Sequence, residues 1–345
     1  MLVREFHYEL PQERIAQQPV EPRDHSRLMV LFSSGRIEHK RFYDLPSFLT
    51  GGDVMVFNDT RVIPARLHGM KERGGASVEI LLLRETERDV WEALVRPGKR
   101  LKPGQAILFG RGELKGEIRD CAASGGRIIA FSGEGPVREA IRRLGQMPLP
   151  PYIHAPLKDQ DRYQTIYARV DGSAAAPTAG LHFTPELMEK LGNKGIGEAF
   201  VTLHVGLDTF RPVRTAHLED HRIHREFCSV SPETAALIRD SKTQGRRIIA
   251  VGTTVARTLE TFTGTDGNIS SGSAWTDLFI YPGFRFRTVD GLVTNFHLPR
   301  SSLLMMVSAF AGRERMFGAY REAIRAGYRF FSFGDAMLIC NEKWD

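Results

Sequence analysis

Short apolar runs that end in polar turns recur along the chain, and they predict a sheet with helices between its strands. Residues 28–32 and 53–60 are apolar segments typical of buried strands, and the second ends in polar residues. From about residue 150 onward, helix-like and strand-like segments alternate, which indicates an α/β layer. The expected helices are 184–194, 231–241, 253–262, 301–311 and 313–326, and the expected strands are 199–205, 247–253, 275–281 and 328–333.

Residues 66–147 follow a different pattern. Five short strand-like segments are separated by Gly or Pro at regular intervals, which is typical of a small antiparallel barrel or sandwich. The earlier pattern resumes after Leu149-Pro150-Pro151-Tyr152. We therefore expect a mixed α/β (α+β) protein in which a large α/β domain, residues 1–65 and 148–345, carries an inserted β-barrel domain, residues 66–147.

The distribution of charged residues bears on the kind of partner that the protein binds. The chain has 345 residues, a formal net charge of +6, and 42% hydrophobic and 26% charged residues, as in ordinary globular proteins. Between Arg96 and Arg119 there are seven basic and two acidic residues, inside the expected insert. Such a segment favours an anionic partner such as nucleic acid, although a solvated surface explains it equally simply.

The cysteines and the apolar runs exclude several classes of protein. The three cysteines, Cys121, Cys228 and Cys340, are far apart, so neither a disulfide framework nor a cysteine-rich zinc site is expected. The N-terminus has no signal-peptide pattern, and no apolar run is long enough to span a membrane. We expect a cytoplasmic protein without a membrane partner.

The segment 174–184 contains the densest mixture of small and chemically active residues. Thr178 and His182 lie among alanines, a proline and Gly180, so a ligand can approach the backbone closely. Thr184 followed by a proline predicts a helix N-cap directly after them. A tight turn entering a helix is the alternative interpretation.

Other apolar strands also end in polar turns. Thr253 and Thr254 follow a glycine at a strand-to-helix turn, where N–H groups and hydroxyls suit an anionic or polar group, although an ordinary N-cap would look the same. The segment is not a P-loop, and no dinucleotide fingerprint occurs. His204 and Asn295 stand in two similar turns, at 202–212 and 295–302. Together the turns predict one composite site at a shared sheet edge, against the alternative of independent structural turns.

A group of histidines invites comparison with zinc sites. His217, His221 and His224 are followed by Glu226, and His204 is a further candidate member of the group. Their spacing matches no zinc-protease motif, so no metal site is expected. Acid–base or phosphate-contact roles suit one or two of these histidines better.

These segments occur in the same order in the S-adenosylmethionine:tRNA ribosyltransferase-isomerases of queuosine biosynthesis, and the chain resembles that family from end to end. Matching stretches include FNDTRVIPAR at 57–66, PTAGLHFT at 177–184 and TNFHLP at 294–299. Further matches are 23–28, 161–168, 204–212, 251–260, 281–284 and 330–337. Two positions depart from the family pattern, with Asp208 in place of a glycine and Ser302 in place of a threonine. Asp208 leaves the roles of residues in the 204–212 turn open.

The resemblance implies a specific reaction. The ribosyl part of S-adenosylmethionine is transferred to 7-aminomethyl-7-deazaguanine at the wobble position of tRNA and is isomerised. The products are epoxyqueuosine, adenine and methionine. The resemblance implies S-adenosylmethionine as a cosubstrate, tRNA as the partner, no metal and no prosthetic group, and we expect a monomer. Two alternatives are a non-catalytic RNA-binding protein and a methyltransferase, and the missing glycine-rich loop weighs against the latter.

The chemistry suggests residues for each role. A base removing the C5′ proton beside the sulfonium, and an acid assisting adenine departure, should have pKa values near neutrality, which favours histidine. The catalytic candidates are His182, His204, His224 and His297. The candidates for binding S-adenosylmethionine are Asn58, Asp59, Thr178, Gly180, Phe183, Arg211, Thr253, Thr254, Arg257 and Asn295, and those for binding tRNA are Lys99, Arg100, Lys102 and Tyr163. In this assignment Arg257 or Arg211 meets the carboxylate, and Tyr163 or Phe183 stacks on a base.

Overall fold

The computed structural model describes residues 1–98, 101–122, 125–157, 159–206 and 213–340, and the chain divides into two compact units. The larger unit comprises Met1–Thr60, Pro151–Val170 and Ala176–Asp345. The smaller unit comprises Arg61–Pro150 and Asp171–Ala175, so it contains the expected insert and extends it at both ends. The mixed α/β architecture with a β-barrel confirms the fold class expected from the sequence.

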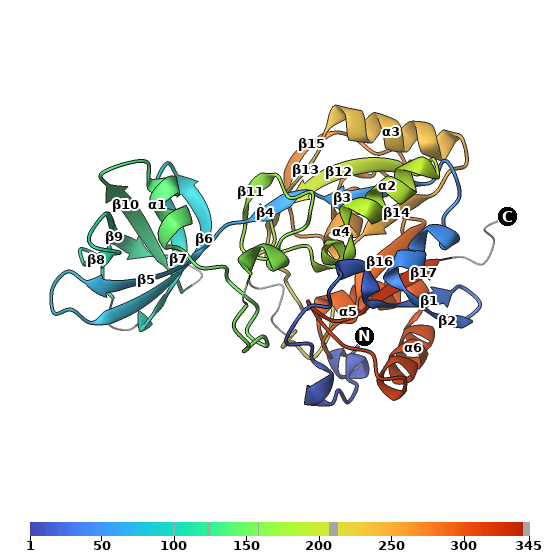
Figure 1. The fold of residues 1–345 in the computed structure, drawn as a ribbon, viewed down its shortest axis with the longest axis horizontal. Coiled ribbons are helices and arrows are strands. Elements are labelled where there is room, and N and C mark those ends of the chain that lie inside the picture. Colours follow the sequence, from blue (N-terminus) through green and yellow to red (C-terminus); the bar gives the residue numbers. More distant parts are fainter. Residues whose placement is uncertain (99–100, 123–124, 158, 207–212, 341–345) are drawn as a thin grey trace. The chain divides into compact units, whose positions relative to one another are not determined.

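The larger unit is built on a nine-stranded mixed sheet (Figure 1). In spatial order its strands are β15 (Gly272–Thr276), β13 (Glu226–Val230), β12 (Gly197–Leu203), β3 (Val54–Asn58), β14 (Ile248–Val251), β16 (Gly291–Asn295), β17 (Ala336–Cys340), β1 (Arg27–Phe32) and β2 (Ile37–Arg41). The four central strands β12, β3, β14 and β16 are mutually parallel. Their carboxyl ends therefore meet at one edge of the sheet, which is where open α/β sheets hold ligands.

Both faces of this sheet are covered by apolar packing. Val54 and Val56 of β3 join a core with helices α3 (Pro232–Thr243) and α4 (Thr253–Phe262), and with α5 (Ser302–Ala311) and α6 (Arg313–Arg325). Met55 and Phe57 join a second core with α2 (Pro185–Asn193). Alternate residues of one strand thus face opposite sides, which explains why the strand reads as a continuous apolar run.

Side-chain caps start three of these helices where the sequence predicts them. The hydroxyls of Thr184, Ser231 and Ser301 accept hydrogen bonds from backbone N–H groups three residues later, in α2, α3 and α5. Short 3₁₀ helices complete the unit: η1 (Val3–Phe6), η2 (Gln12–Arg14), η3 (Arg23–His25), η4 (Phe42–Phe48), η6 (Gln160–Tyr163) and η7 (Thr178–His182).

The smaller unit is a closed antiparallel barrel. Its strands follow the spatial order β10 (Arg127–Gly133), β7 (Val90–Arg96), β6 (Ser77–Glu87), β5 (Arg66–Lys71), β8 (Ala106–Phe109) and β9 (Leu114–Cys121). Alternating residues of β6, namely Val78, Ile80 and Leu82, point into its core, and helix α1 (Val137–Leu144) packs there through Val137 and Ile141. The strands β4 (Thr60–Val62) and β11 (Val170–Ser173) form a separate two-stranded sheet.

Two strand predictions are wrong. Residues 328–333 form no strand: Phe330 makes only an isolated bridge with Ile15, and Phe331 has a φ of 72°, which turns the chain out of an extended ladder. The last described strand is β17 instead. The strand expected at 275–281 is β15, which ends at Thr276, opposite the first residue of its partner β13. Strand β5 and helix α1 were not expected at all.

No helix in the described part of the chain has the length and apolarity needed to cross a bilayer.

Candidate functional site

The polar turns that the sequence singled out gather at the carboxyl edge of the central parallel strands. Asn58 ends β3, His204 follows β12, Thr253 begins the helix after β14, and Asn295 ends β16. Since these four strands are neighbours, residues from distant parts of the chain lie at one edge.

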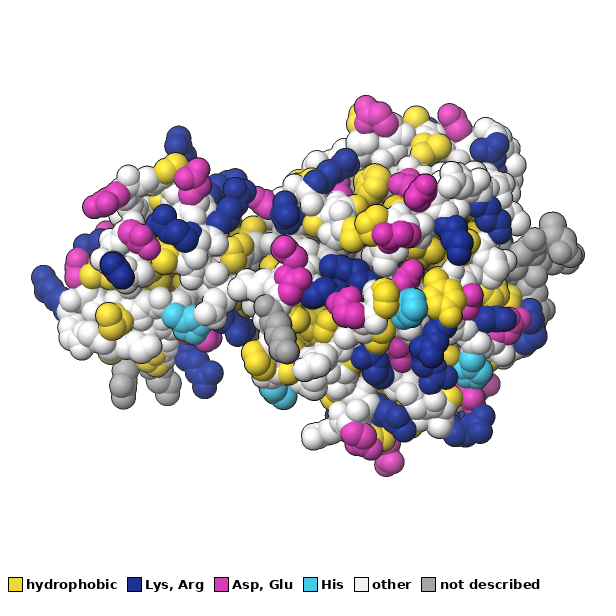
Figure 2. Space-filling model, viewed as in Figure 1, with side chains coloured by type: hydrophobic (Ala, Val, Ile, Leu, Met, Phe, Trp, Pro, Cys, Tyr) yellow, Lys and Arg dark blue, Asp and Glu magenta, His cyan; other side chains and the backbone are white. Residues whose placement is uncertain are grey.

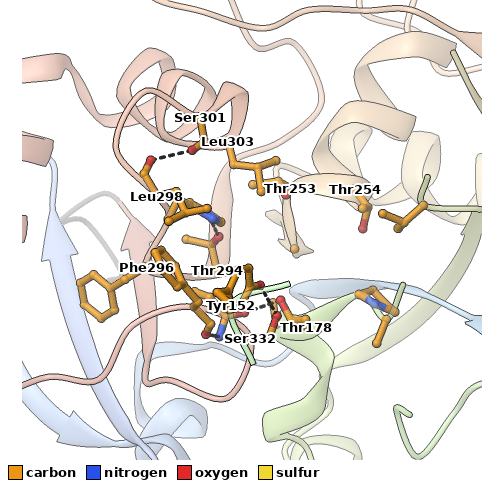
Figure 3. Close-up of a pocket in the computed structure, with 18 residues that line it drawn as sticks. Tyr152, Thr178, Thr253, Thr254, Thr294, Phe296, Leu298, Ser301, Leu303 and Ser332 are labelled. Atoms are coloured by element: carbon orange, nitrogen blue, oxygen red, sulfur yellow. Dashed lines mark hydrogen bonds between the residues drawn. The ribbon is translucent and has the colours of Figure 1, made fainter. Parts of the chain in front are cut away.

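A pocket of about 650 Å³, its open mouth included, lies there (Figure 3). Thr178, Thr253 and Asn295 line it, from η7, α4 and β16 respectively. The sequence prediction that these turns contribute to one cavity is therefore met for these three residues. The other lining residues are Tyr152, Ala176, Pro177, Ala179, Val205, Gly252, Thr254, Thr294, Phe296, His297, Leu298, Ser301, Leu303, Phe331 and Ser332.

A second, smaller pocket shares three of these lining residues, Thr253, Thr254 and Leu303. Its volume is about 370 Å³, its open mouth included, and the charged side chains of Glu226 and Arg257 line it. The two pockets thus lie on either side of the beginning of α4, one lined mostly by hydroxyls and apolar groups and the other containing an ion pair.

His182 hydrogen-bonds the pocket residue Asn295 on one side and the buried Ser26 on the other. The Asn295 amide donates to Nε2 of His182 at 3.1 Å, and Nδ1 of His182 lies 2.7 Å from the Ser26 hydroxyl. The ring also stacks on Phe42. Burial lowers the pKa of His182 to about 3, and the positive charges of three arginines, Arg329, Arg162 and Arg23, add to the effect. The imidazole is therefore neutral near pH 7, and both of its nitrogens are occupied.

Asn58 is also buried, and its side-chain amide hydrogen-bonds the backbone where strands β3 and β12 end. Its Oδ1 accepts from the backbone N–H groups of Thr60 and Leu203, while its Nδ2 donates to the Leu203 carbonyl. Nδ2 also reaches the hydroxyl of Thr254 at 3.3 Å. Asn58 thus contacts the pocket through Thr254 and does not line it itself.

Glu226 and Arg257 form a buried ion pair that the half-buried His224 joins by a hydrogen bond. The Arg257 guanidinium donates to Glu226 Oε2 at 2.6 Å and to two backbone carbonyls. His224 Nε2 lies 3.0 Å from the other carboxylate oxygen. Burial by itself would raise the pKa of Glu226, but the hydrogen bond from His224 and the charge of Arg257 outweigh it and lower that pKa. Glu226 is anionic, and Arg257, expected to meet a ligand carboxylate, is already paired with a protein carboxylate.

The other two candidate catalytic histidines, His297 and His204, differ in exposure. His297 lines the larger pocket, its Nε2 lies 2.8 Å from the Thr294 hydroxyl, and burial lowers its pKa to about 3. His204 is half-buried, stacks on Phe227, and its Nδ1 lies 2.8 Å from the Thr60 hydroxyl. His204 is adjacent in sequence to Val205, which lines the pocket.

Several predicted ligand-binding residues lie in the protein interior instead. Tyr163 and Phe183 are both 0% exposed, so neither ring offers a face to a base, and the stacking role expected for them does not fit this structure. Gly180 packs against Tyr167, where a Cβ would lie 2.1 Å from the hydroxyl. Asp59 is ion-paired with Arg169 and accepts from Thr202.

The expected tRNA-contacting residues are only partly described. Lys99 and Arg100 lie outside the described residues, as do Arg211, expected to bind S-adenosylmethionine, and Asp208, which departs from the family pattern. Lys102 is exposed, and Arg127 binds the carbonyls of Gly98 and Leu101 close to it. In the view of Figure 2, basic side chains on the barrel unit are interspersed with acidic ones.

Much of the pocket wall was not predicted from the sequence. The hydroxyls of Tyr152 and Ser332 lie 2.7 Å apart and line the pocket with the adjacent Phe331. Ser332 lies within the family-like stretch 330–337, which was the available signal, but the expectation of a strand there concealed it. Tyr152 stands after a proline pair and gave no chemical signal.

Among the described residues, no group of three or more His, Cys, Asp or Glu side chains is arranged to hold a metal ion.

Comparisons with known proteins agree on one family. A family model described as "Queuosine biosynthesis protein" matches residues 3–339. The S-adenosylmethionine:tRNA ribosyltransferase-isomerase of Moorella thermoacetica is 58% identical over 341 residues, covering 98% of this chain and 100% of that protein. The enzyme of the same name from Desulfitobacterium hafniense is 55% identical over 340 residues, covering 98% and 100%. The crystal structure of S-adenosylmethionine tRNA ribosyltransferase from Thermotoga maritima is similar with a TM-score of 0.57 at 44% identity, covering 97% of this chain and 99% of that one.

Proposed function

Because the chain belongs to the queuosine biosynthesis protein family and is an enzyme of that family, we propose that it transfers and isomerises the ribosyl part of S-adenosylmethionine. The acceptor is 7-aminomethyl-7-deazaguanine at the wobble position of tRNA. The products are epoxyqueuosine, adenine and methionine. S-adenosylmethionine acts as a cosubstrate, and the enzyme works as a cytoplasmic monomer without a metal.

One observation carries this proposal. Thr178, Thr253 and Asn295 come from three separate segments and line one pocket, next to a second pocket with an ion pair. A sulfonium nucleoside has matching parts, namely an apolar base with polar edges, a ribose with hydroxyls, and a charged amino acid. The hydroxyl-lined pocket suits the nucleoside, and the pocket of Glu226 and Arg257 suits the charged end.

Because His182 and His297 are buried, we assign proton transfer to the other two candidate histidines, His204 and His224. His182 has both nitrogens occupied, so we assign it a positioning role for Asn295. His297 lines the pocket as a neutral ring and offers hydrogen bonding to the ribose. His204 and His224, both half-buried beside pocket residues, are proposed as the base that takes the C5′ proton and the acid that protonates adenine.

Adenine release in the presence of tRNA carrying 7-aminomethyl-7-deazaguanine tests the proposal. The wild-type chain should release adenine and methionine only with this tRNA. His204→Gln and His224→Gln should each reduce kcat by at least about 100-fold, as expected for a general acid or base. Full activity of both variants would remove these histidines from the mechanism.

The same assay separates the competing functions. A methyltransferase would release S-adenosylhomocysteine in place of adenine. An RNA-binding protein without chemistry would show no saturable thermal shift with S-adenosylmethionine. Either result would reject the proposed reaction.

A further inference from the structure

The direction of the hydrogen bond at Thr178 is fixed by the protein. The Asn295 amide lies 3.2 Å from the Phe331 carbonyl, which can only accept, so the NH₂ group must face it. The amide oxygen then faces Thr178, at 3.0 Å from its hydroxyl. Because an amide oxygen can only accept, the hydroxyl hydrogen of Thr178 is used inward, and only lone pairs remain for the pocket.

His182 is compatible with the same direction. With the Asn295 amide oriented by the Phe331 carbonyl, Nε2 of His182 accepts the second hydrogen of the NH₂ group, so the ring hydrogen is on Nδ1 and is donated to Ser26. The buried ring stays neutral near pH 7. A flipped Asn295 would place its oxygen against the Phe331 carbonyl and would leave two buried acceptors facing each other.

The hydroxyl of Thr254, which lines the same pocket, has the opposite hydrogen-bonding character. The Asn58 amide faces the Leu203 carbonyl at 3.0 Å, which fixes its orientation, and its NH₂ group donates to the Thr254 hydroxyl. Thr254 therefore accepts from the protein and keeps its own hydrogen to donate. Two buried asparagines thus give two threonines of one pocket opposite hydrogen-bonding characters.

We propose that Thr178 is a specificity-determining residue whose hydroxyl, held as an acceptor by Asn295 and His182, selects a neutral N–H group, the exocyclic amine of adenine. This inference rests on the proposed function, since S-adenosylmethionine supplies the adenine. None of the described residues lining this pocket is acidic, and Tyr152, Pro177 and Phe331 add apolar surface. An ammonium group lacks a counter-charge there.

Hypoxanthine provides the contrasting ligand, because it has a carbonyl where adenine has the amine and an N–H where adenine has a ring nitrogen. We therefore compare 5′-methylthioadenosine with 5′-methylthioinosine as competitors of S-adenosylmethionine binding, without tRNA. The wild-type protein should prefer the adenine compound by about 10- to 100-fold, the usual effect of one mismatched buried hydrogen bond. Equal affinities for the two compounds would overturn the proposal.

Matched variants test whether the preference for the adenine compound depends on the Thr178 hydroxyl and on Asn295. Thr178→Ser keeps the hydroxyl and should keep the preference, whereas Thr178→Val should reduce it to within about threefold, because only the hydroxyl is lost. Asn295→Leu releases the Thr178 hydrogen, which can then be donated to the hypoxanthine carbonyl, so the preference should also collapse. Equal weakening of both compounds by Asn295→Leu would indicate a merely structural role and would overturn the assignment.

His182 is tested as a positioning residue. His182→Gln can offer an amide oxygen to the Asn295 NH₂ group and should retain the preference for adenine. His182→Leu leaves one hydrogen of that group unpaired and should reduce the preference without abolishing it, because the Phe331 carbonyl still orients the amide. The base preference itself is measured, so a general loss of stability does not imitate the effect. An unchanged preference in the Leu variant would contradict the positioning role of His182. Adenine release with tRNA is recorded separately, so a failure of the proposed reaction remains distinguishable from a failure of base selection.

Discussion

The guanidinium of Arg257 lies 2.6 Å from the carboxylate of Glu226, and both side chains are almost completely buried, with 6% and 3% of their surfaces exposed. In such a pair, each charge depends on the other for its compensation, because water does not reach either of them. The pair also joins strand β13 to helix α4 in the wall of the smaller pocket.

Removing one partner should therefore be far more harmful than removing both. Glu226→Gln leaves a buried arginine without its counter-charge and should lower the free energy of unfolding by about 3–5 kcal/mol. The double variant Glu226→Leu with Arg257→Met should lose clearly less. Urea unfolding measures both. The exposed pair Arg225–Asp277 is the control, and Arg225→Ala should cost less than about 1 kcal/mol. Equal losses in the single and the double variant would contradict this account.

Buried neutral histidines should make the fold sensitive to acid. The pKa values of His182 and His297 fall from 6.5 to about 3 on burial. As the pH falls below 6.5 the unfolded chain binds protons that the folded chain does not, so stability is present above this pH and is lost between pH 6.5 and 3. The free energy of unfolding, measured by urea unfolding at each pH across this range, should fall more steeply for the wild type than for a His182→Gln, His297→Gln variant, by up to a few kcal/mol at the acidic end. Parallel curves would disprove the contribution of these two residues.

Gly180 should be intolerant of a side chain for reasons of packing. A Cβ there would lie 2.1 Å from the buried Tyr167 hydroxyl and 2.8 Å from the Thr165 methyl group. Gly180→Ala should cost about 1–3 kcal/mol by overpacking, and Tyr167→Phe should restore part of it. Gly192, inside α2 with no atom within 4 Å of its added Cβ, is the matched control and should gain about 0.5–1 kcal/mol as alanine. Thermal unfolding measures all three, and a neutral Gly180→Ala would refute the packing argument.

Lys102 tests the nucleic-acid role of the barrel. Its side chain is exposed, and Arg127 donates to the backbone carbonyls of the nearby residues Gly98 and Leu101. If it contacts a phosphate, Lys102→Ala should weaken tRNA binding and reduce the slope of log K against log salt by about 0.7–0.9. Lys190→Ala, at the end of α2, provides an equally exposed control. An unchanged slope for Lys102→Ala would assign this lysine to solubility alone.

The position of the pocket could be predicted from sequence, because it follows from strand direction. Asn295 and Thr253 come directly after apolar strands, and parallel neighbours bring such turns to one edge. What the sequence could not show is which side chains turn inward. His182 and Phe183 stand in a segment of small and polar residues, yet Phe42 of the 3₁₀ helix η4 covers both rings. That contact joins segments far apart in the chain.

Strand limits failed for a related reason. The aromatic stretch 328–333 has the composition of a strand, but Phe331 adopts a left-handed conformation and Phe330 packs on Phe296. Tertiary packing decides the backbone there, and local propensity does not. The barrel was easier to foresee because its strands pair mostly with near neighbours in sequence, which short turns make recognisable.

The pairing of β1 with β17 determines when the larger unit can be completed during synthesis. Leu28 pairs with Ala336, so β1, which can pair with its neighbour β2 early, gains its second partner only after residues 336–340 have been synthesised. Strand β3 gains its partners late as well, since β12 and β14 are translated after the entire barrel. The barrel has all its strands in one continuous stretch and can fold first, before the central strands of the larger sheet are complete.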